Sequence, residues 1–153
     1  MEKGKRRKLL NLVKNKLISK AFFGFVHLRF PERAVPDALN LPGVFMYRSA
    51  ENLSRLTNAE KRSAFGIEFI VYVHSSTDLE LVKADAEDEL EEAIIELQTD
   101  SAFSDLSGVE IKVTGSDSSP LALASLGISE AVAPPFGAVR IVSEIVFDYQ
   151  AID

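Results

Sequence analysis

The sequence predicts an α+β fold, in which a mostly antiparallel four-stranded sheet is packed by an N-terminal helix and a central amphipathic helix. Three observations support this fold class. Apolar residues recur at helical spacing in two separate segments. Four further segments are rich in β-branched and aromatic residues or alternate between apolar and polar positions, as strands do. The strands come in consecutive pairs on either side of the central helix, which favours antiparallel neighbours.

The first predicted helix runs from Glu2 to Ala21. Its apolar residues fall on one arc at helical spacing: Leu9, Leu10, Val13, Leu17 and Ala21. Gly4 lowers the helix propensity, and the cations that surround it sit at the N-terminal end, where the helix dipole disfavours positive charge. We therefore expect residues 1–8 to be loose.

The first pair of strands is predicted at Val44–Arg48 and Phe65–His74, because both segments are rich in β-branched and aromatic residues. The polar segment Ser49–Ser63 is expected to be a long exposed connection between them. Phe22–Phe30 is compatible with a short strand. Three prolines in Pro31–Pro42 predict a loop there.

The central helix is predicted from Thr77 to Leu97, with an apolar stripe that covers the sheet. The stripe consists of Leu79, Val82, Ala86, Leu90, Ala93 and Leu97, with Ile94 at its margin. The remaining faces are strongly acidic. Ile95 projects opposite the stripe among these acids, which indicates either a subunit contact or an accidental exposed residue.

The second pair of strands is predicted at Val109–Val113 and Val139–Ala151, both of which alternate cleanly. Between them, Gly115–Gly137 is rich in Ser, Pro and Gly, and we expect a long loop that orders against a partner. A chain of 153 residues is sized for one hydrophobic core, so residues 1–153 are expected to form a single domain.

The charge is distributed unevenly along the chain. The formal net charge is −6, yet the first twenty residues carry eight Lys and Arg against one Glu. From Glu68 to Glu110 there are thirteen acidic residues and one basic residue. A positive end and a negative body suit contacts between subunits. We predict subunit-interface residues in both regions: Arg6, Arg7, Lys8 and Asp88.

No catalytic, cofactor-binding or metal-binding residues are predicted. The chain has no cysteine, and His27 and His74 lack a partner at metal-ligand spacing. The cations of Lys3–Lys8 have no interleaved aromatic residues, so no direct nucleic-acid readout is expected. Since no apolar run approaches the length of a membrane-spanning helix, no membrane partner is expected. An enzyme whose site is built from Asp, Glu or Ser side chains on loops ranks third, after an assembling subunit and a ligand-binding domain.

The order of elements resembles that of the tail terminator, or tail completion, proteins of long-tailed bacteriophages, including those of lambda-type and Mu-like phages. The resembling features are the N-terminal helix, the amphipathic central helix and four strands. These strands are Leu41–Tyr47, Ile67–Val73, Val109–Val113 and Val139–Tyr149. The resemblance covers most of the chain as a pattern of elements.

This resemblance implies a structural subunit without enzymatic activity. Such a subunit forms a homo-oligomeric ring, a hexamer, at the end of the tail tube, ends tube polymerisation and mediates head–tail joining. Its implied partners are copies of itself, the tail tube protein and the head-completion protein. Its implied location is the virion tail of a phage or prophage, assembled in the host bacterial cytoplasm. The residues alone leave open a small-molecule or regulatory binding domain, in which the Ser/Pro loops contact the ligand.

Overall fold

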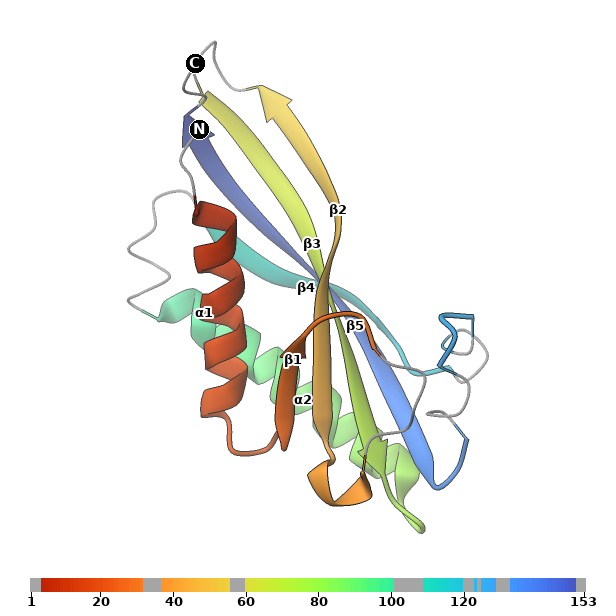
Figure 1. Ribbon diagram of the computed structural model, residues 1–153. Coiled ribbons are helices and arrows are strands. Elements are labelled where there is room, and N and C mark those ends of the chain that lie inside the picture. The colour runs from red at the N-terminus through yellow and green to blue at the C-terminus, as the bar shows by residue number, and fades with distance from the viewer. Residues whose placement is uncertain are drawn as a thin grey trace.

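The computed structural model describes residues 4–31, 37–55, 60–100, 109–119, 123, 125–128 and 133–150. In this part of the chain, two helices pack on one face of a five-stranded sheet (Figure 1). The elements, in chain order, are α1 (Lys5–Ser19), β1 (Phe25–Leu28), the 3-10 helix η1 (Ala38–Asn40), β2 (Gly43–Arg55), β3 (Glu60–His74), α2 (Leu79–Thr99), β4 (Glu110–Asp117) and β5 (Phe136–Gln150). Neither helix of the described residues combines the length and apolar composition needed to cross a membrane.

The strand order is β1-β2-β3-β5-β4, with β1 parallel to β2 and all other neighbours antiparallel. The α+β class is confirmed, but the prediction of four strands is wrong, because β1 makes the sheet five-stranded and mixed. Phe25 lies opposite Gly43, and its ring fills the space that a Cβ at Gly43 would occupy. The pairing of β1 with β2 therefore depends on Gly43, which is distant in sequence. The residue pattern within Phe22–Phe30 alone does not reveal it.

Strands β2 and β3 form a longer ribbon than the sequence predicts. They remain paired from Gly43 opposite Tyr72 to Arg55 opposite Lys61, with an irregularity between Arg48 and Glu51. The prediction of Ser49–Ser63 as an exposed connection is therefore wrong. This half of the ribbon extends past the N-terminal end of α1 (Figure 1), so much of it lacks a covering layer and needs no apolar alternation.

The core consists of two clusters on opposite faces of the sheet. On the helix-covered face, Leu9, Val13 and Leu17 of α1 and the apolar stripe of α2 pack against the strands. The other cluster contains Phe45, Ile70, Tyr72, Leu123, Ile128 and Ala138. Consecutive residues Phe69 and Ile70 are therefore both fully buried. Packing on two faces explains why β3 reads as a nearly continuous apolar run.

The predicted loop Gly115–Gly137 is shorter in the structure, because β4 continues to Asp117 and β5 begins at Phe136. Of the residues described between these strands, Leu123 and Ile128 are each 1% exposed in the second cluster. This part of the segment packs on its own sheet, although the sequence led us to expect that it orders against a partner.

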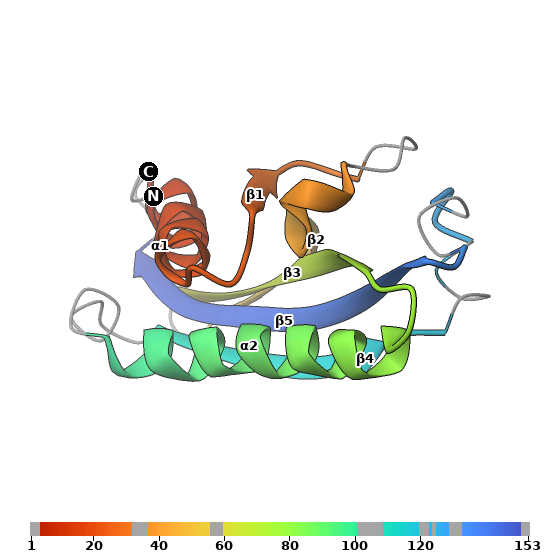
Figure 2. The ribbon, with the colours of Figure 1, turned by 90° about the horizontal axis from the view of Figure 1, so that it is seen from below.

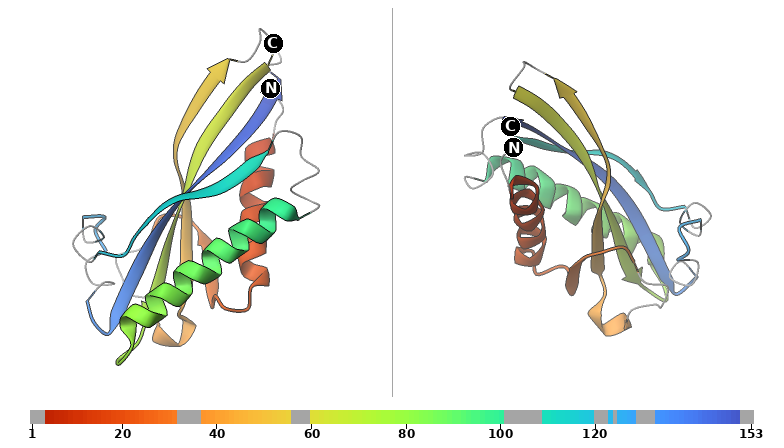
Figure 3. Two further views of the ribbon diagram at one scale, coloured as in Figure 1. Left: turned by 180° about the vertical axis from the view of Figure 1, so that it is seen from behind. Right: turned by 45° about the horizontal axis from the view of Figure 1, so that its top comes forward.

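The two helices lie over different parts of the same sheet face. Helix α1 contacts β1, and α2 contacts β3, β4 and β5. Figure 2 shows α1 toward the β1 side and α2 alongside β4. Buried residues of both helices belong to the same core cluster, so both cover one face of the twisted sheet, which Figure 3 shows from two further directions. The helix layer therefore has one helix toward each edge of the sheet.

Candidate functional site

Arg6, the first predicted interface residue, is engaged within its own subunit. Its Nε and Nη2 donate to Oε1 and Oε2 of Glu51, both at 2.8 Å, and its guanidinium lies over the Phe147 ring at 5.5 Å from the ring centroid. The hydrogen bonds from Arg6 lower the pKa of Glu51 below its ordinary value. Lys5 Nζ also donates to the backbone oxygen of Asp148 at 2.6 Å. Residues 5–8 of the segment predicted to be loose therefore form the first turn of α1 and fasten it to the sheet, while residues 1–3 lie outside the described residues.

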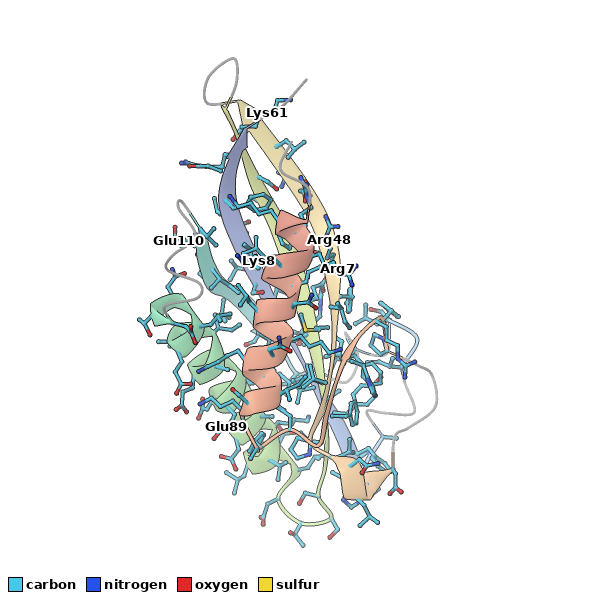
Figure 4. All side chains as sticks on the ribbon, turned by 60° about the vertical axis from the view of Figure 1, so that its left-hand side comes forward. Arg7, Lys8, Arg48, Lys61, Glu89 and Glu110 are labelled. Atoms are coloured by element: carbon cyan, nitrogen blue, oxygen red, sulfur yellow. The ribbon has the colours of Figure 1, made fainter. Side chains whose placement is uncertain are left out.

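Arg7 and Lys8 occupy the outer face of α1. Both side chains are exposed, and Figure 4 shows them on either side of the N-terminal end of the helix. Within the described ranges, neither forms an ion pair. They border a surface hollow of about 340 Å³, which we call the α1 hollow. Its lining is Gly4, Arg7, Lys8, Asn11, Leu12 and Asn15.

The composition of the α1 hollow follows from the sequence of the helix. Gly4 has a positive φ of 85°, and nothing lies within 4 Å of where its Cβ would be, so this end of the hollow stays open. Asn11 and Asn15 are short, and the partly buried Leu12 supplies apolar surface. The hollow is thus an apolar depression with two cations beside it.

At the other end of α1, Lys16 and Lys20 are neutralised within the chain. Lys16 Nζ lies 2.9 Å from Glu96 Oε2, and Lys20 Nζ lies 2.9 Å from the same oxygen and 3.4 Å from Glu92 Oε1. Hydrogen bonds from Lys20 and Lys16 lower the pKa of Glu96 to about 2. The Glu96 bond in turn raises the pKa of Lys20. These pairs clamp the C-terminal end of α1 to α2.

Asp88, the predicted interface residue on α2, is exposed on a face that it shares with Glu91 and Ile95, because residues three and four apart lie side by side on a helix. Burial raises the pKa of the neighbouring Glu87 carboxyl, and the charges of Glu91 and Asp88 raise it further. The carboxylates of Glu87, Asp88 and Glu91 therefore lie close enough together on this face to repel one another. Ile95 is 67% exposed beside it.

A groove of about 470 Å³ runs between α2 and the edge strand β4. It is lined by Glu91, Ile94, Ile95, Gln98, Thr99, Ile111, Lys112 and Val113. Gln98 spans one end of it, because its Oε1 accepts from the Ile111 N–H at 2.6 Å and its Nε2 donates to the Val109 carbonyl at 3.5 Å. The side-chain amide thus takes the place of a neighbouring strand and shields that part of the sheet edge.

A polar cluster on the other face of the sheet is not predicted from the sequence. Arg140 donates to the buried carboxylate of Glu68, and Tyr47 lies opposite Glu68 on the adjacent strand. Burial, together with the Glu68 charge, raises the pKa of Tyr47 to about 12. The phenol therefore stays protonated at neutral pH and is not poised to act as a base. Charged residues within otherwise apolar strands were the available signal for this ion pair.

The two histidines lie against aromatic rings. His27 stacks on Phe25 with centroids 4.8 Å apart, and His74 makes an edge contact with Phe136 at 4.9 Å. Across the described ranges, no group of three or more His, Cys, Asp or Glu side chains is placed to hold a metal ion. The strongest candidate site is therefore the pair of outer helix faces, which carry charges of opposite sign.

No protein-family model matches the chain, and no curated protein sequence matches it either.

Proposed function

We propose that the chain is a structural subunit that assembles head to tail with copies of itself into a closed ring, and that this ring ends the tail tube of a phage or prophage. One observation carries the proposal: the helix layer offers two unlike surfaces with complementary charge. The α1 surface holds Arg7 and Lys8, and the α2 surface holds Asp88, Glu91 and Ile95. Contact between unlike patches generates a ring when the rotation between copies closes.

The arrangement of the helices supports this mode of assembly. Helix α1 packs toward β1 at one edge of the sheet, and α2 packs toward β4 at the other. After each addition, the growing assembly still has one free α1 surface and one free α2 surface at its two ends, so association continues until the ring closes. Opposite charges on the two surfaces orient the encounter and disfavour like-to-like pairing.

The tail-tube role rests on the order of elements, which resembles that of phage tail terminator proteins. In this proposal one side of the ring contacts the tail tube protein and the other contacts the head-completion protein. The chain contributes shape and binding surfaces to both contacts and no chemistry.

The ring is tested with the purified full chain by sedimentation velocity and electron microscopy at low and high salt. We expect closed rings of one size at low salt, with association weakened as salt screens the exposed charges. A chain that remains monomeric at every protein concentration and ionic strength contradicts the ring.

The tail role is tested separately by deleting the gene from a phage or prophage that carries it. Tail tubes of uncontrolled length that fail to join heads are expected. Tails of normal length on infectious particles would contradict the terminator role while leaving ring formation intact.

A further inference from the structure

We propose that Ile95 of one copy inserts into the α1 hollow of the next copy, with Glu91 and Asp88 facing Lys8 and Arg7. The inference rests on the self-assembly proposed above and names the contact that produces it. The occupant of each surface is thus a second copy of this chain.

The apolar part of the contact pairs a protruding side chain with a depression. Ile95 is 67% exposed, and its neighbours toward the N-terminus of α2 are carboxylates. Water contact with so large an apolar side chain is unfavourable, and burial at an interface removes it. The α1 hollow offers about 340 Å³ and the apolar surface of Leu12. Within the described part of one subunit, the Ile95 side chain remains exposed and the α1 hollow remains open. Insertion of Ile95 into the hollow of a second copy would bury both apolar surfaces.

The charges follow the same order along both helices. Glu91 lies four residues before Ile95, and Lys8 lies four residues before Leu12. At a rise of 1.5 Å per residue, each charge lies about 6 Å from its apolar neighbour along the helix axis. When Ile95 sits over Leu12 and the two helices run in the same direction, Lys8 therefore faces Glu91. Asp88 then lies about 4.5 Å further along the axis, between the levels of Arg7 and of the open end at Gly4.

Three other cations at the two ends of α1 are held by their own chain. Arg6 is bonded to Glu51, and Lys16 and Lys20 are paired with carboxylates of α2. Arg7 and Lys8 are the exposed cations that border the hollow. On α2, Asp88 and Glu91 lie beside Glu87, whose pKa is raised by burial and by these two charges. An arriving cation relieves that repulsion, so the surfaces are complementary in charge as well as shape.

The experiment measures self-association of the full chain by sedimentation velocity for three single variants. Lys8→Glu, Glu91→Lys and Ile95→Ser each alter one part of the contact. Matched controls make the same chemical change elsewhere: Lys61→Glu and Glu110→Lys, both shown in Figure 4, and Leu81→Ser, which alters a 66% exposed residue on the same helix. Circular dichroism checks that every variant is folded.

We expect each contact variant to weaken association by about tenfold or more, which corresponds to about 1.4 kcal/mol per tenfold change, while the controls stay within about twofold. The double variant Lys8→Glu/Glu91→Lys is expected to recover part of the loss, because the reversed charges again face each other across the contact.

The outcomes separate this contact from the ring itself. A ring that forms equally well in contact and control variants overturns the contact and leaves the proposed function standing. A wild-type chain that never associates overturns both. If Lys8→Glu weakens assembly while Glu91→Lys and Ile95→Ser do not, then Lys8 contacts a different surface of the neighbouring copy, and the contact is overturned.

Discussion

Arg6 and Arg7 are chemically identical neighbours in the chain, and the fold gives them opposite surroundings. Arg6 turns toward the sheet and makes two 2.8 Å hydrogen bonds with Glu51. Arg7 turns outward and forms no ion pair within the described ranges. One residue step rotates a side chain by about 100° around a helix, which is enough to move it from the sheet to the outer surface. A run of like charges can therefore serve both the fold and an interface.

The acidic helix is divided in the same way. Glu96, with Glu92, binds the lysines of α1 within the chain. Asp88 and Glu91 share the outer face with Ile95. On both helices, residues that maintain the fold therefore lie close in sequence to residues that we assign to assembly. All stability measurements are made in salt high enough to keep the chain monomeric.

The largest expected effect comes from the buried face of α1. Leu17 is fully buried, while the next residue, Ile18, is 54% exposed. We expect Leu17→Ala to lower the free energy of unfolding by about 2–5 kcal/mol through lost burial and the cavity left behind. Ile18→Ala should change it by less than about 0.5 kcal/mol. Urea unfolding measures both, and equal losses would contradict the assignment of inner and outer faces.

The next effect concerns the two arginines. Arg6→Met should lower the free energy of unfolding by about 1.5–3 kcal/mol, because it removes two charged hydrogen bonds and leaves the Glu51 carboxylate without them. Arg7→Met should change stability by less than about 0.5 kcal/mol. The same urea titration compares them. A destabilising Arg7→Met beside a neutral Arg6→Met would reverse the roles that we assign.

A smaller loss is expected at the edge strand. Gln98→Ala removes the acceptor of the Ile111 N–H and should cost about 1–2 kcal/mol, because that backbone group is partly buried. Gln98→Glu keeps an acceptor and should cost less. Urea denaturation measures the loss in the free energy of unfolding. Light scattering without denaturant tests whether the uncovered strand edge promotes aggregation. An unchanged Gln98→Ala variant would show that the side chain does not protect β4.

The smallest effect is a pH dependence of the α1–α2 clamp. The pKa of Glu96 is lowered from its ordinary 4.5 to about 2, so its stabilising contribution is complete above pH 4.5 and is lost as pH falls toward 2. The effect is small because the carboxylate is 39% exposed and screened by solvent. The difference in melting temperature between wild type and Glu96→Gln should therefore shrink from pH 5 to pH 2. A difference independent of pH would contradict the clamp, and Glu110→Gln serves as the control.

Several elements were predictable because local periodicity reports burial. The apolar arcs located α1 and α2, and alternation located most of β5 and one face of β3. Pairing was not predictable, because the parallel contact of β1 with β2 depends on Phe25 fitting over Gly43. The polar half of the β2–β3 ribbon carries no apolar signal, so it was predicted to be a connection.

The candidate site was predictable only in outline. Charge asymmetry indicated α1 and α2 as the regions involved, and Ile95 was identified from its helical position. Helical spacing places Arg6 on the side of Leu9 and Val13, but its partner was not predictable, because it depends on where Glu51 lies in the folded sheet. The α1 hollow likewise depends on the placement of short side chains around Leu12.

The central claim is that two unlike surfaces join one copy to the next, and a mixing experiment tests it most directly. The variant Arg7→Glu/Lys8→Glu retains only the α2 surface, and Glu91→Gln/Ile95→Ser, which introduces no positive charge to pair with the new glutamates, retains only the α1 surface. Native mass spectrometry should find each variant monomeric alone and a one-to-one pair in the mixture, because a heterologous contact then stops after a single junction. No pair in the mixture, or rings formed by either variant alone, would contradict the account.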